Sequence, residues 1–289
     1  MQRRWPTFLD TPPDEADPTR ARVALVPVPY DGTLSYRSGA RNGPSAIIGA
    51  SRHLEDYDLE LDRDPSVVGV HTAPAIEPDL GRPERLVAQV REAVYGFASM
   101  GKLVGLLGGE HTIAVGAVQA LSDIYSDLSV LYLDAHADMR DEFMGTRYGH
   151  ATVARRIHDL CPLVEVGVRS LSLEERDTIR NERVPVVFWA DPGVDIERIA
   201  QTALESLSSR VYVSVDLDVL DPSIMAAVGT PEPGGMTWET LSALLRTVGD
   251  NREIVGFDVS ELSPDEGPEA CAFTAAKLVY KLIAYATMR

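Results

Sequence analysis

The sequence predicts an α/β fold in three layers, α/β/α, around a central and mainly parallel eight-stranded sheet. Three observations support this prediction. Eight short runs rich in apolar and β-branched residues recur along the chain, and segments with helical periodicity lie between them. The strand-like runs are almost continuously apolar, which is typical of parallel strands whose two faces are both covered by helices.

The expected elements follow one another along a single domain. The strands are expected at residues 21–29, 66–71, 102–108, 128–134, 162–168, 184–189, 210–216 and 253–259. The expected helices include residues 83–100, 196–209, 237–249 and 268–287. Residues 1–20 are polar and contain several prolines and acids, so we expect an N-terminal extension there and one domain over residues 21–289.

The composition narrows the classes of function. The 289 residues are 45% hydrophobic and 25% charged, and the formal net charge is −17. Such an acidic chain lacks the basic face of a nucleic-acid binder and would modestly favour cationic small molecules. Two cysteines, Cys161 and Cys271, are too few for a disulfide framework. We find neither a signal-peptide pattern nor an apolar run long enough to span a membrane, so we predict a cytoplasmic protein.

Unusual polar residues follow four of the expected strands. His111 comes after the first of these strands in GGEHT, and Glu261 comes after the last in SELSP. Between them, DAHAD places Asp134, His136 and Asp138, and DLDVLDP places Asp216 and Asp218. Because parallel strands end at the same edge of a sheet, we expect all of these side chains to meet there.

This set of side chains predicts a pair of metal ions. Residues two apart in an extended segment point to the same side, so each aspartate pair can face one point. Four aspartates buried together would repel one another, and two divalent cations would balance their charge. Oxygen and imidazole ligands without a thiolate favour manganese or iron, with zinc as an alternative. A water between two such ions would become a nucleophile near neutral pH.

Other residues of the same types have simpler explanations. Asp221 stands before a proline and is expected to form a turn. We interpret His53, His71 and His158 as structural or surface histidines, because none belongs to the four strand ends.

At these motifs the sequence resembles the ureohydrolase family of arginases and agmatinases. The matching segments are GGEHT, DAHAD, SVDLDVLDP, GTPEPGG and DVSELSP, in the family's order, and the resemblance runs from about Val23 to the C-terminus. It implies an arginase-like fold, two Mn²⁺ per chain and hydrolysis of a guanidino compound. It also implies a homotrimer or homohexamer. One departure is Glu110, where many relatives have aspartate; we expect this residue not to bind metal.

The resemblance also implies residue roles. His111, Asp134, Asp138 and Asp216 would hold one manganese ion, and His136, Asp134, Asp216 and Asp218 would hold the other. His150, in RYGHAT, would be a catalytic and substrate-binding residue that moves a proton to the leaving group. Glu261 would bind the substrate guanidinium, because a planar cation pairs well with a carboxylate.

The substrate is less tightly defined. The loop MRDEFMGTRYGH and the segment GTPEPGG look agmatinase-like, which favours agmatine, hydrolysed to putrescine and urea in polyamine biosynthesis. We expect Asp141 and Glu142 to form an acidic wall for its ammonium group. Arg140 and Arg147 would instead suit a carboxylate-bearing substrate such as guanidinobutyrate or formiminoglutamate. Aminopropyl-agmatine and arginine are further alternatives. A metal-binding protein without turnover is the non-enzyme alternative. We expect no nucleic-acid or membrane partner.

Overall fold

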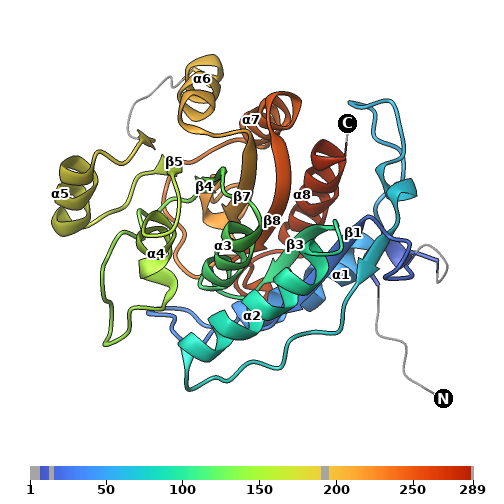
Figure 1. The fold of residues 1–289 in the computed structure, drawn as a ribbon, viewed down its shortest axis with the longest axis horizontal. Coiled ribbons are helices and arrows are strands. Elements are labelled where there is room, and N and C mark those ends of the chain that lie inside the picture. The colour runs from blue at the N-terminus through green and yellow to red at the C-terminus, as the bar shows by residue number, and fades with distance from the viewer. Residues whose placement is uncertain (1–6, 13–15, 190–194, 288–289) are drawn as a thin grey trace.

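The computed structural model describes residues 7–12, 16–189 and 195–287. Its centre is an eight-stranded sheet in the order β2-β1-β3-β8-β7-β4-β5-β6, with every neighbouring pair parallel (Figure 1). The strands are β1 Val23–Val28, β2 Val70–Thr72, β3 Leu103–Gly108, β4 Leu128–Leu133, β5 Leu163–Val168, β6 Val186–Phe188, β7 Arg210–Asp216 and β8 Glu253–Ser260. The expected sheet of eight parallel strands is confirmed.

Helices cover both faces of the sheet. They are α1 Gly43–Ser51, α2 Pro83–Ala98, α3 Ile113–Ile124, α4 Val153–His158, α5 Leu173–Glu182, α6 Ile196–Ser206, α7 Trp238–Asn251 and α8 Ala270–Ala286. Buried residues of α1, α6, α7 and α8 share one apolar core, and those of α2, α3, α4 and α5 share a second. Figure 1 shows α2 and α3 in front of the sheet. The predicted three layers are therefore present.

Two expected strands are shorter than the sequence indicated. Residues 66–68 belong to a 3-10 turn, Pro65–Val68, because the Asp64 carboxylate accepts a hydrogen bond from the Ser66 N–H at 2.8 Å and starts the turn. The strand begins only at Val70. At the other sheet edge, Val184 still closes α5 by donating its N–H to the Ile179 carbonyl, so β6 starts at Val186.

The parallel arrangement decides where the unusual polar residues lie. The register pairs the last residues of β7 and β8, Asp216 with Ser260, and pairs Leu133 of β4 with Val215 of β7. The segments that follow these strands therefore emerge at one edge of the sheet. Among the described residues, every helix is too short or too polar to span a bilayer.

Candidate active site and metal centre

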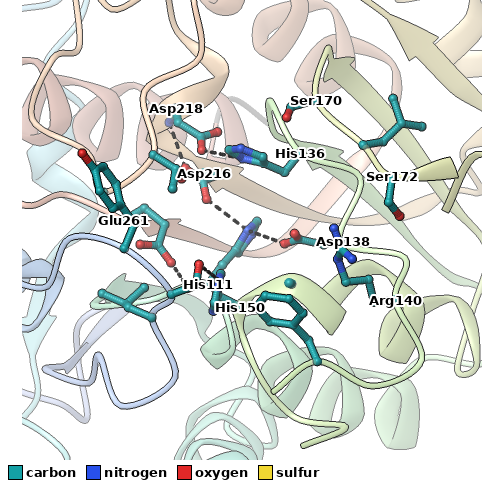
Figure 2. A pocket seen from close by; sticks show the side chains of 18 of the residues that line it. His111, His136, Asp138, Arg140, His150, Ser170, Ser172, Asp216, Asp218 and Glu261 are labelled. Atoms are coloured by element: carbon teal, nitrogen blue, oxygen red, sulfur yellow. Dashed lines mark hydrogen bonds and ion pairs between the residues drawn. The ribbon is translucent and has the colours of Figure 1, made fainter. Parts of the chain in front are cut away.

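The predicted site residues meet at the carboxyl ends of β3, β4, β7 and β8 (Figure 2). His111 Nδ1 lies 3.0 Å from Asp134 Oδ2 and 3.4 Å from Asp216 Oδ2. His136 Nδ1 lies 2.9 Å from Asp218 Oδ2 and 3.5 Å from Asp134 Oδ1. The predicted convergence is therefore present, although these residues come from distant parts of the chain.

The donor atoms form two overlapping groups. His111, Asp134 and Asp216 make the first, and Asp134, His136 and Asp218 make the second; within each, the donor atoms lie within 4.8 Å of one another. Asp134 belongs to both, as expected for a bridging ligand. Asp216 belongs to the first group, and its Oδ1 accepts the Asp218 N–H at 2.8 Å.

Asp138 lies beside the first group and is held by a tyrosine. Its Oδ2 is 3.9 Å from His111 Nδ1 and accepts a hydrogen bond from the Tyr132 hydroxyl at 2.7 Å. The Tyr132 ring stacks on the His111 imidazole with 4.6 Å between ring centroids. Tyr132, which the sequence did not single out, therefore orients one predicted ligand and packs against another.

The acids and histidines of this cluster shift one another's pKa values. Burial and the neighbouring acids raise the pKa of Asp138 and Asp216 well above the usual range. Burial alone would lower the pKa of His111, but its hydrogen bonds to Asp134 and Asp216 raise that pKa well above its ordinary value. The carboxyl groups thus need protons or cations beside them. Converging carboxylate and imidazole donors without a thiolate fit divalent ions such as manganese, which would replace those protons.

A pocket of about 320 Å³ opens onto this cluster. The residues that line it include Leu34, Ser35, Tyr36, Arg37, His111, His136, Asp138, Arg140, Phe143, His150, Ser170, Ser172, Glu175, Asp216, Asp218 and Glu261. This volume suits a small molecule. Five of the six predicted metal ligands, all except Asp134, therefore line one cavity together with the two predicted substrate-binding residues.

His150 and Glu261 both lie in the wall of this pocket. His150 Nε2 is 3.1 Å from Ser35 Oγ, and the imidazole meets the Phe143 ring edge-on, with 5.7 Å between centroids. Burial, and then the positive charge of His136, lower the pKa of His150 to about 4. Glu261 Oε1 accepts the His111 N–H at 2.7 Å, and burial raises the pKa of Glu261 well above its usual range.

The prediction that Asp141 and Glu142 form an acidic wall of the pocket is wrong. Asp141 is exposed and pairs with Arg147 at 2.8 Å and with Arg156 at 2.5 Å, and neither Asp141 nor Glu142 is among the residues lining the pocket. The pocket acid that the sequence missed is Glu175, which is 3% exposed. Its position at the start of α5 was detectable from the capping box Ser172-x-x-Glu175, but its place in the pocket was not.

Arg140 is the one loop arginine of the sequence analysis that lines the pocket. Its Nη2 lies 3.5 Å from Glu175 Oε2, and its guanidinium lies 5.1 Å from the centre of the Phe143 ring. In Figure 2, Arg140 and Ser172 lie on the side of the pocket opposite Glu261. The far wall therefore carries a paired cation and anion, and not an unpaired arginine.

The fold and the site together define a protein of the arginase family, and a sequence model of that family matches residues 21–284. The chain belongs to this family, among its agmatinase-like ureohydrolases. It is 41% identical to the N(1)-aminopropylagmatine ureohydrolase of Thermus thermophilus, over 95% of this chain and 92% of that protein. It is 35% identical to the agmatinase of Pyrococcus horikoshii, over 91% of each chain.

Solved structures agree with this assignment. The crystal structure of agmatine ureohydrolase of Thermoplasma volcanium matches with a TM-score of 0.88 and 32% identity, over 98% of this chain and 94% of that chain. The predicted arginase-like fold is confirmed.

Proposed function

We propose that this chain hydrolyses the guanidinium group of a polyamine-like substrate to urea and the free amine. Four relatives named N(1)-aminopropylagmatine ureohydrolase are 37% to 41% identical to it, so we place N1-aminopropylagmatine first and agmatine second. The observation that carries the proposal is the buried carboxyl group of Glu261, held at the wall of the pocket beside the metal-ligand cluster.

The proposed cofactor is two Mn²⁺ per chain. His111, Asp134, Asp138 and Asp216 would hold one ion, and His136, Asp134, Asp216 and Asp218 the other. The two donor groups support the division except for Asp138, which lies beside the first group, and for the sharing of Asp216 with the second. Bound manganese would supply Lewis acidity and a water-derived nucleophile near neutral pH. The chain itself supplies the buried, mutually oriented donors.

The residues of the pocket divide the remaining tasks. Glu261 binds and orients the guanidinium through charge-assisted hydrogen bonds. Water adds its oxygen to the guanidinium carbon, and the bond from that carbon to the substituted nitrogen breaks. His150, whose lowered pKa keeps it neutral, accepts a proton as the water attacks and passes it to the leaving amine, so that the products are urea and an alkylammonium ion. Its position beside the same cavity supports this role.

Glu175 favours an amine on the far end of the substrate. Its carboxylate accepts hydrogen bonds from Ser172 N–H and Oγ, both at 2.7 Å, and from Met139 N–H at 3.2 Å, so it is fixed in the pocket wall. An ammonium group of the substrate would share this carboxylate with Arg140. A guanidine with a carboxylate tail would meet repulsion from Glu175, although Arg140 would attract it.

The test is product release from a panel of substrates by the manganese-loaded protein. We expect kcat/KM to be highest for N1-aminopropylagmatine or agmatine and lower for guanidinobutyrate, arginine and formiminoglutamate, the last assayed by formamide release. Preference for a carboxylate-bearing substrate would contradict the polyamine assignment. Two bound metals with no product from any compound would support the binding-protein alternative.

We also propose that the protein is a homotrimer or homohexamer, which light scattering tests.

A further inference from the structure

Glu110 is a buried link between two loops at the site. Its carboxyl group accepts hydrogen bonds from the Thr33 N–H at 2.8 Å, the Thr33 hydroxyl at 2.6 Å and the Thr112 hydroxyl at 2.5 Å. Its own N–H donates to the Tyr30 carbonyl at 2.7 Å. The loop after β1 is therefore fastened to the loop after β3 by both backbone and side chain.

Glycine before Glu110 makes this close approach possible. A Cβ atom on Gly109 would lie 1.8 Å from the Tyr30 carbonyl oxygen, so a side chain there would force the two loops apart. The fully buried Glu110 then spans the remaining gap to Thr33. The close contact between the loops that follow β1 and β3 therefore fixes the position of Thr33.

Thr33 in turn contacts His150 through one oxygen atom. The His150 N–H donates to Thr33 Oγ1 at 3.1 Å, and Thr33 Oγ1 lies 3.4 Å from His150 Nδ1. A threonine hydroxyl has one proton to donate and two lone pairs to accept. Because the proton goes to Glu110, Thr33 can interact with the imidazole only as an acceptor.

We propose that Glu110 and Thr33 are positioning residues that fix the tautomer of His150, with the proton on Nδ1. The ring nitrogen that faces an acceptor must carry the proton, and the other nitrogen of a neutral imidazole then keeps its lone pair. That second atom is Nε2, which lies 3.1 Å from the hydroxyl of Ser35 in the pocket wall. The chain of hydrogen bonds therefore makes Nε2 the atom that exchanges protons with substrate. This inference rests on the proposed function only for its catalytic consequence.

The direct test reads the tautomer without any turnover. In protein labelled with ¹⁵N-histidine, the His150 signals are identified by their loss in His150→Asn. We expect Nδ1–H in the wild type and a shift toward Nε2–H in Thr33→Val, which keeps the side-chain shape and removes the hydroxyl. Thr33→Ser, which restores the hydroxyl, should restore the wild-type spectrum. An Nε2–H tautomer in the wild type would overturn the inference. An Nδ1–H tautomer that persists unchanged in Thr33→Val would also overturn it.

The kinetic test asks whether Thr33 influences kcat through its contact with His150. Thr33→Val should lower kcat by about 10- to 100-fold with little change in KM and in bound metal, because misplacing the proton on His150 would lose part of the roughly 10²- to 10⁴-fold that general acid–base catalysis contributes. In the His150→Asn background the same substitution should change kcat less than twofold. If Thr33→Val lowers kcat by the same factor in the His150→Asn background as in the wild type, Thr33 acts by a route other than His150. If the wild type itself turns over no guanidine, the proposed function fails while the spectroscopic result still decides the tautomer.

Glu110 has its own matched variants. Glu110→Gln replaces one acceptor oxygen with an N–H₂ group, which either faces the Thr33 N–H or donates to the Thr33 hydroxyl and reverses the chain of hydrogen bonds. We expect this variant to lose the Nδ1–H signal as Thr33→Val does. Glu269→Gln, on the exposed surface before α8, is the matched control and should leave the spectrum and kcat unchanged. A wild-type spectrum in folded Glu110→Gln would contradict the role of the carboxylate.

Discussion

The backbone N–H of His111 donates a hydrogen bond of 2.7 Å to Oε1 of Glu261, although the two residues are 150 positions apart. Each follows a central strand, β3 and β8, and these strands are direct neighbours in the sheet. Glu261 adopts a positive φ of 67° at the turn out of β8. One hydrogen bond thus ties the predicted guanidinium-binding group to the backbone of a predicted metal ligand.

Replacing Glu261 by glutamine should separate substrate binding from metal binding. The amide oxygen can still accept the His111 N–H, but the negative charge that would pair with a guanidinium is lost. We expect two metals per chain and a kcat/KM lower by about 1,000-fold, since loss of a buried charge partner costs about 3–5 kcal/mol. Metal analysis and urea release measure the two effects. Glu253→Gln, at the exposed opposite end of β8, should match the wild type, and near-normal turnover of Glu261→Gln would refute the assignment.

Metal analysis should distinguish the shared aspartate from its neighbour. Asp134 contributes to both donor groups, whereas Asp138 lies beside the first one only. We therefore expect Asp134→Asn to reduce both bound ions and Asp138→Asn to reduce mainly one. Chelation should abolish activity and added Mn²⁺ should restore it. One ion per chain in fully active protein would rule out the paired site.

Glu175→Gln should change the choice of substrate more than the rate of the reaction. Glutamine can keep the capping box with Ser172, so α5 should stay in place. We expect KM to rise about tenfold for substrates that carry an ammonium tail, equivalent to about 1.4 kcal/mol, and to change little for butylguanidine, whose tail is neutral. Asp141→Asn, an exposed acid outside the pocket lining, is the control. Equal effects on charged and neutral tails would exclude Glu175 from tail recognition.

A separate prediction concerns the cluster that fastens α8 to the segment before β2. Lys281 Nζ lies 2.7 Å from both Asp58 Oδ2 and Glu60 Oε2. Lys281→Met would leave the buried Asp58 without this cation, so we expect a loss of about 3 kcal/mol in the free energy of unfolding at pH 7. Urea denaturation measures it. Lys277→Met, whose cation stacks on Tyr280 on the same helix, should cost less.

The same cluster predicts an acid-dependent loss of stability. Burial raises the pKa of Glu60, but hydrogen bonds from Lys281, Arg246 and Tyr285 outweigh it and lower that pKa below the ordinary value. A depressed folded-state pKa stabilises the protein above the unfolded-state value, about 4.3, and this stabilisation disappears as the pH falls through the folded-state pKa. The stability difference between the wild type and Lys281→Met should therefore narrow between pH 5 and pH 3. A constant difference would contradict the linkage.

The sequence predicted the sheet and the convergence of six metal-ligand candidates because parallel strands share one carboxyl edge, whatever their order. It could not predict that order, because an apolar run does not identify its neighbours. Asp141 illustrates a second limit: a loop acid close to a ligand in sequence turned outward to meet Arg156. Glu175 shows the opposite case. It lies in the first turn of α5, far from the metal-ligand motifs in sequence, and the loop before α5 brings it into the pocket lining.

The sheet also has a consequence for how the protein is made. β8 comes last in sequence among the described strands, yet it pairs with both β3 and β7 in the middle of the sheet. Without residues 253–260, the other described strands can pair only as two separate sheets, β2-β1-β3 and β7-β4-β5-β6, and the edges that β8 would join stay open. His111 lies on the first part, and Asp134 and Asp216 lie on the second. We therefore expect a newly synthesised chain to assemble its ligand cluster only after β8 has been synthesised.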